Sequence, residues 1–214
     1  MGSSLAFGMS MWTTMMVAMM IPSAAPTILL YARVQRRAGV SPPPTAAFAA
    51  GYLLCWTAFA AAAAFLQAAL EGSGLAPSLM TGHGGSRAGA ILIVGVGLYQ
   101  LSPLKNACLA RCRSPAQFLS RHYRPGARGA LRLGLLHGAY CVGCCWALMI
   151  LLFAVGVMNL AWVAGLTLLV AAEKLLPGGR IVSRAAAIAL LLWGGAELLA
   201  GSAAAPVPPT GMRM

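Results

Sequence analysis

Residues 134–149 read GLLHGAYCVGCCWALM and contain no charged side chain. They lie within a longer apolar segment, residues 131–157, which as an α-helix is long enough to cross the roughly 30 Å hydrocarbon core of a bilayer. Side chains four residues apart share one face of a helix. Four potential metal donors follow this spacing: His137, Cys141, Cys145 and Met149. A fifth, Cys144, lies three residues after Cys141. The stretch therefore predicts a membrane-spanning helix with one face rich in sulfur and imidazole.

The rest of the chain is also apolar. Of its 214 residues, 60% are hydrophobic and only 8% are charged, with a mean hydropathy of +0.81, whereas soluble domains carry about 25% charged residues. Six segments are long enough to span a membrane: residues 5–31, 45–70, 88–104, 131–157, 159–176 and 181–201. We therefore expect an all-α, polytopic transmembrane helix bundle, with one domain over residues 1–201 and a disordered, proline-containing tail over residues 202–214.

The basic residues are concentrated in alternate loops between the expected spans. Thirteen of the fifteen Lys and Arg side chains follow the first, third and fifth spans: Arg33, Arg36, Arg37, Lys105, Arg111, Arg113, Arg121, Arg124, Arg128, Arg132, Lys174, Arg180 and Arg184. This pattern places those loops in the cytoplasm and both termini outside it. It also predicts that the positive charge contacts anionic lipid headgroups of the bilayer rather than nucleic acid.

Methionines are concentrated on the first expected span, where Met11, Met15 and Met19 share one face and Met16 and Met20 form an adjacent stripe. By length, they lie near the middle of the membrane, at the depth of the cysteines. Thioether sulfur is a ligand that soft Cu(I) prefers. The alternative interpretation is that methionine serves here as a flexible apolar filler.

Two further sites leave alternatives open. Cys108 and Cys112 follow the third span, and one helical turn would put both thiols on the same side, for metal binding or redox chemistry, although a chance pairing fits as well. Their cytoplasmic placement argues against a permanent disulfide. Glu173 and Lys174 lie at the end of the fifth span. Either both side chains snorkel to the membrane interface, or the Glu173 carboxylate receives or releases an ion.

The fourth span also has a structural interpretation. Gly134 and Gly138 have the spacing that lets a neighbouring helix approach closely, so the thiols could be inert parts of a packing face. Three cysteines, a histidine and a methionine on one stripe favour function instead, because polar and ionisable groups inside a membrane are costly.

Several stretches together resemble a bacterial family of predicted metal-binding integral membrane proteins, the domain of unknown function 2182, which is described as copper-chaperone-like. The similar stretches are residues 15–26 (MMVAMMIPSAAP), 99–105 (YQLSPLK) continuing through Cys108 and Cys112, 137–149, 156–160 (GVMNL) and 173–175 (EKL). The resemblance implies a multi-pass protein of the bacterial cytoplasmic membrane that handles copper.

We therefore expect a Cu(I)-binding protein, rather than an enzyme, that transfers copper within or across the membrane to or from a partner protein. The expected metal ligands are Cys141, Cys144, Cys145, His137, Met149, Cys108, Cys112, Met15, Met16, Met19 and Met20. Zinc fits less well, because it has no use for thioethers. The two alternatives are a membrane thiol–disulfide oxidoreductase, based on Cys141 and Cys144, and a structural or assembly subunit of a membrane complex.

Overall fold

A computed structural model describes residues 2–37, 39, 43–74, 87–156 and 159–203. These residues form eight helices and no strand, which confirms the all-helical prediction for the described part of the chain. The helices are α1 (Gly2–Arg37), α2 (Pro43–Gly72), α4 (Arg87–Leu101), α5 (Pro103–Arg113), α6 (Pro115–His122), α7 (Gly126–Val155), α8 (Leu160–Leu175) and α9 (Gly179–Ala203). Helix α9 includes the first residues of the expected tail, and residues 204–214 lie outside the described residues.

Four helices are long and apolar enough to cross a membrane: α1, α2, α7 and α9. Helices α4 and α5 would add a fifth crossing only if this bent pair counts as one span. Helix α8 has 16 residues, or about 24 Å at 1.5 Å per residue, which is short of the roughly 30 Å hydrocarbon core. The described residues therefore support a membrane protein, but they do not confirm six spans.

The chain bends by 60° between α4 and α5, at Ser102. The Ser102 side chain accepts a hydrogen bond from the Lys105 backbone N–H, and Pro103 occupies the first turn of α5, where its missing N–H costs nothing. The segment after residue 104, expected as a loop between spans, is helical and forms α5 and α6. Lys105, expected in that loop, has no exposed surface.

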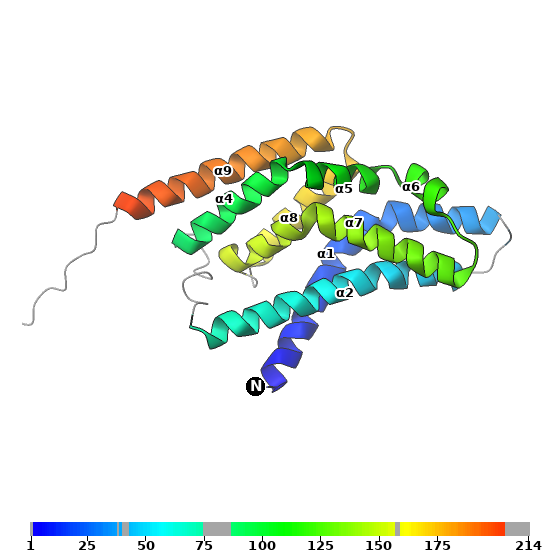
Figure 1. Ribbon diagram of the computed structural model, residues 1–214, viewed down its shortest axis with the longest axis horizontal. Coiled ribbons are helices and arrows are strands. Elements are labelled where there is room, and N and C mark those ends of the chain that lie inside the picture. The colour runs from blue at the N-terminus through cyan, green and yellow to red at the C-terminus, as the bar shows by residue number, and fades with distance from the viewer. Residues whose placement is uncertain (1, 38, 40–42, 75–86, 157–158, 204–214) are drawn as a thin grey trace, which may run out of the picture.

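Helix α7 is the centre of the bundle and packs along α2 (Figure 1). The two backbones approach closely at glycines: a Cβ added to Gly134 would collide with the Phe48 carbonyl, and one added to Gly138 would lie 2.8 Å from Cys55 Cβ. This confirms the expected close approach of a neighbouring helix and identifies that helix as α2. Helices α4 and α9 form a second close pair on the other side of α7 (Figure 1).

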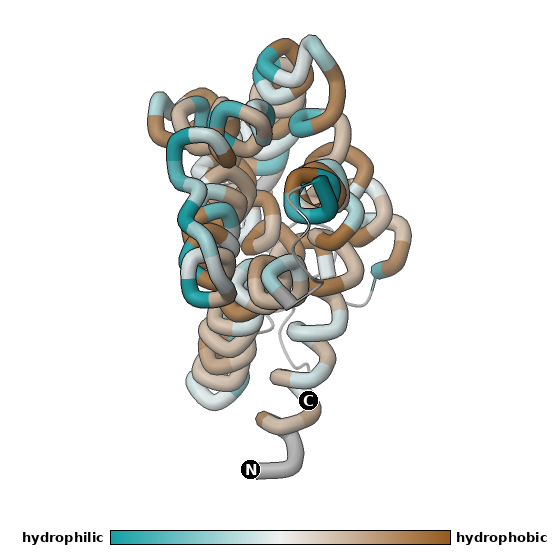
Figure 2. Tube along the Cα trace, turned by 90° about the vertical axis from the view of Figure 1, so that its right-hand side faces the viewer, coloured by the Kyte–Doolittle hydropathy of each residue, from teal (hydrophilic) through white to brown (hydrophobic). Residues whose placement is uncertain are grey.

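Large apolar side chains are exposed on several helices, and brown, hydrophobic stretches recur along the trace in Figure 2. Leu160 is 81% exposed, Leu199 74% and Ile181 73%. Surfaces of this kind are stable against lipid chains and not against water, so this exposure agrees with a membrane protein.

Candidate metal centre

The three cysteines of α7 lie deep in the bundle. Cys141 and Cys144 are 1% exposed and Cys145 is fully buried. The thiols of Cys144 and Cys145 both donate to the Cys141 carbonyl, at 3.1 and 3.0 Å. A thiol is a weak donor, so these contacts satisfy the buried sulfurs only loosely. They leave both sulfurs available to a stronger partner.

Helix α5 brings two more thiols to the same place. The Cys144 side chain interacts with Cys112 of α5 as well as with Cys141 and Cys145. Cys108 packs against Gly143, where an added Cβ would lie only 2.9 Å from Cys108 Sγ. The sequence pattern predicts the α5 and α7 cysteines as two separate groups. The structure joins them, and we call Cys108, Cys112, Cys141, Cys144 and Cys145 the thiol cluster; all five are free cysteines.

Polar groups from three other helices surround Cys141. Lys174 Nζ of α8 donates to Cys141 Sγ at 2.9 Å and to Ser23 Oγ of α1 at 3.2 Å. Tyr52 Oη of α2 lies 3.1 Å from Cys141 Sγ and donates to the Met20 carbonyl at 3.1 Å. Cys141 is thus the point at which α1, α2, α7 and α8 are linked by hydrogen bonds.

Nothing in the sequence pattern marks Tyr52 or Ser23 as site residues, and the pattern places Lys174 at the membrane boundary. The sequence signal for Lys174 is an ionisable residue at the end of an apolar helix. That signal does not show which residues its side chain contacts. Lys174 is 8% exposed and Glu173 1% exposed, so the snorkelling interpretation is wrong for both.

Glu173 forms a buried ion pair with the end of α5 that carries Lys105. Lys105 Nζ lies 2.7 and 2.8 Å from the two Glu173 carboxylate oxygens, and neither side chain is more than 1% exposed. Gln100 contacts both partners. At the other end of α5, Arg113 donates to the carbonyls of Leu176 and Pro177. These contacts fix α5, and with it Cys108 and Cys112, against the end of α8.

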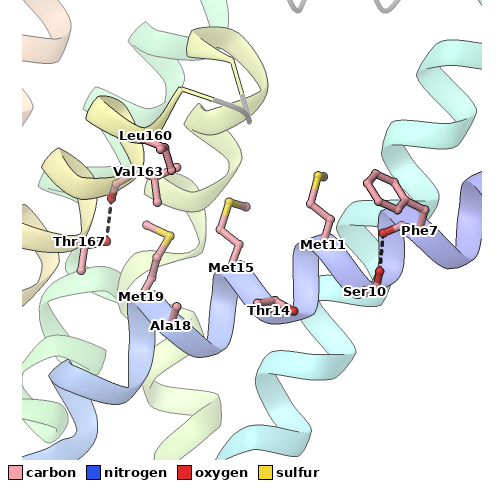
Figure 3. Close-up of a pocket in the computed structure, with 10 residues that line it drawn as sticks. All are labelled: Phe7, Ser10, Met11, Thr14, Met15, Ala18, Met19, Leu160, Val163 and Thr167. Atoms are coloured by element: carbon pink, nitrogen blue, oxygen red, sulfur yellow. Dashed lines mark hydrogen bonds between the residues drawn. The ribbon is translucent and has the colours of Figure 1, made fainter.

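The methionines of α1 face two different surroundings. Met16 and Met20 are fully buried beside Trp12, in the same apolar cluster as the α7 cysteines and Met149. Met11, Met15 and Met19 instead line an open groove of about 580 Å³ between α1 and α8, and their side chains extend from the same side of α1 (Figure 3). Met19 belongs to both environments, because it is 2% exposed and packs in the core cluster.

His137 lies among aromatic rings rather than among thiols. Its ring centroid is 5.3 Å from that of Phe118, 5.7 Å from Tyr52 and 6.0 Å from Phe48. Its Nδ1 atom is buried and has no hydrogen-bond partner among the described residues. A buried nitrogen without a partner is costly. His137 is one turn from Cys141 on α7, but the structure does not join it to the thiol cluster.

The donors fit a soft cation better than a hard one, because they are thiols with thioethers nearby. Within the described residues, no three His, Cys, Asp or Glu side chains converge closely enough to hold a metal ion together. A structural zinc ion requires four tetrahedral ligands. The arrangement therefore suits an ion that is held by few sulfur ligands.

A family model described as "PpoB2: Copper chaperone" matches residues 9–196, which include every candidate ligand. No curated protein and no solved structure matches the chain.

Proposed function

The chain belongs to the PpoB2 copper chaperone family, and on this premise we propose that it binds Cu(I) within a membrane and passes it to an acceptor protein. The observation that carries the proposal is the thiol cluster, in which two helices bring five free cysteines together inside an apolar bundle. Thiolate sulfur selects Cu(I) over harder cations. Cys141, Cys144 and Cys145 form the proposed core of the site.

The methionine groove supports a route for the ion toward the thiol cluster. Met11, Met15 and Met19 line an open groove, and Met19 also packs in the cluster that contains the α7 cysteines. Thioethers bind Cu(I) reversibly, so we propose that the ion moves along this stripe to Met19 and then to the thiols. Met16, Met20 and Met149 are buried in the same cluster and serve as additional donors.

Cys108 and Cys112 of α5 support a point of entry for a partner protein. Cys112 is 9% exposed, and Cys108 is more accessible. We propose that a partner protein that donates or accepts copper reaches the thiol cluster through Cys108. The basic residues of α5, α6 and the α6–α7 connection suit the cytoplasmic face of a bacterial inner membrane, where they would meet anionic headgroups.

Metal analysis tests the proposal. Protein purified in detergent under anaerobic conditions with Cu(I) should retain about one copper per chain, and replacing Cys141, Cys144 and Cys145 with Ser should abolish retention. Cys55→Ser is the matched control, because Cys55 donates to the Leu135 carbonyl on the α2–α7 contact and lies outside the proposed site. It should retain copper fully.

Two outcomes would refute the proposal in different ways. A chain without copper whose Cys141 thiol is alkylated only after reduction would favour a thiol–disulfide oxidoreductase. A chain without copper that tolerates the triple Ser substitution would favour a structural or assembly subunit of a larger complex.

A further inference from the structure

Among the residues that the structure describes, Lys174 is a buried cation without a carboxylate partner. It is 8% exposed, and its ammonium group contacts Cys141 Sγ and Ser23 Oγ. The whole chain has three acidic residues, and each has another partner. Glu173 pairs with Lys105, Glu71 accepts from Gln67, and Glu197 accepts from Trp193.

The absence of a carboxylate leaves sulfur as the group that balances the charge of Lys174. A buried ammonium group that is not paired with an anion is strongly destabilising. Ser23 offers a neutral hydroxyl. Cys141, at 2.9 Å, is the partner that can carry a negative charge, and metal binding to thiols releases their protons.

We propose that Lys174 sets the charge of the cation that the thiol cluster accepts, so that monovalent soft ions are favoured over divalent ones. This inference rests on the proposed function and assigns it a selectivity residue. Two thiolates and one Cu(I) have a net charge of −1, which the ammonium group brings to zero. Two thiolates and a divalent ion are already neutral, so the ammonium group would leave an unbalanced positive charge in an apolar interior.

A third thiolate would restore neutrality for a divalent ion. In the described residues, however, no three Cys, His, Asp or Glu side chains are placed to hold one ion together. A divalent ion would therefore need a rearranged cluster to gain its third and fourth ligands, whereas a two-coordinate monovalent ion needs only two of the thiols. The number of available ligands and the charge of Lys174 therefore both favour a monovalent ion.

The competing explanation is structural: Lys174 would simply link α8 to α1 and α7 through its two hydrogen bonds. The two explanations differ in what a neutral side chain does. Loss of a structural link weakens the binding of all metals alike, while loss of a fixed charge changes the preference between monovalent and divalent ions.

Competition between Ag(I) and Cd(II) tests the inference. Both ions are thiophilic, and they differ in charge. The wild-type protein, reduced and in detergent, should retain Ag(I) in the presence of excess Cd(II). Lys174→Met should move the Ag(I)/Cd(II) affinity ratio toward Cd(II) by about a hundredfold or more, as expected for removal of a unit charge a few Å away at an effective dielectric constant near 20. Lys174→Arg keeps the charge and should keep the preference for Ag(I).

If Lys174→Met lowers both affinities in parallel and leaves the Ag(I)/Cd(II) ratio unchanged, the inference is overturned. The proposed function, copper binding by the thiol cluster, is not affected by that result. If Lys174→Met does not fold, Lys174→Gln, which is also neutral but keeps a hydrogen-bond donor, replaces it, and an unchanged Ag(I)/Cd(II) ratio in that variant overturns the inference. Wild-type protein that binds neither Ag(I) nor Cu(I) overturns the proposed function as well.

Discussion

Replacing Lys105 with Met removes one half of the ion pair that fixes α5 against α8. Lys105 and Glu173 are both essentially unexposed, and the ammonium group lies 2.7 and 2.8 Å from the two carboxylate oxygens. The substitution leaves the Glu173 carboxylate buried with Gln100 as its remaining partner. Loss of one member of a buried pair costs about 3–5 kcal/mol, which is on the order of a hundredfold or more in the ratio of folded to unfolded protein.

Denaturant titration of the protein in detergent micelles measures this cost. Lys105→Met should lower the free energy of unfolding by about 3–5 kcal/mol, and the double variant Lys105→Met, Glu173→Leu should recover much of the loss, because no charge is then left unpaired. Arg121→Met is the control: Arg121 is exposed on α6, and its loss should be nearly neutral. A cost below about 1 kcal/mol for Lys105→Met is typical of an exposed ion pair and would refute the buried position of α5.

Three further substitutions test other parts of the bundle. Gly134→Leu should prevent α2 and α7 from packing, because even a Cβ collides with the Phe48 carbonyl; the expected result is loss of folded protein on size-exclusion chromatography, and a normal yield would contradict it. Gly143→Val should displace Cys108, whose Sγ would lie 2.9 Å from the added Cβ, so that Cys108 alkylates faster in native protein; an unchanged rate would argue against this contact. His137→Phe removes a buried nitrogen without a partner and should stabilise the metal-free protein by about 1 kcal/mol in denaturant titration; destabilisation would show that the imidazole has a partner.

The parts of the structure that depend on local pattern could be predicted from the sequence. The fourth apolar segment forms α7, its three cysteines are buried, and Gly134 and Gly138 admit a close neighbour, because helical spacing alone determines which side chains share a face. The sequence could not identify α2 as that neighbour, since nothing in the local pattern names a partner helix.

The parts that depend on distant partners could not be predicted. The positive-inside pattern placed Lys105 in an aqueous loop, but Glu173, 68 residues further along the chain, pairs with it inside the bundle. The sequence predicts two methionine stripes on α1 but not their surroundings. One stripe meets the apolar core and the other meets the groove beside α8. Helical periodicity identifies the stripes but not what each one faces.

The depth of the α7 sulfurs has a consequence for how copper could be exchanged. Cys141, Cys144 and Cys145 are at most 1% exposed and belong to the buried apolar cluster of the bundle; the polar groups beside Cys141, Lys174 and Tyr52, are buried as well. Water-soluble chelators and oxidants such as glutathione disulfide would be excluded from these atoms by the bundle itself. An ion held there would be kinetically shielded from the thiol pool of the cell, and its release would require physical contact with a specific docking protein.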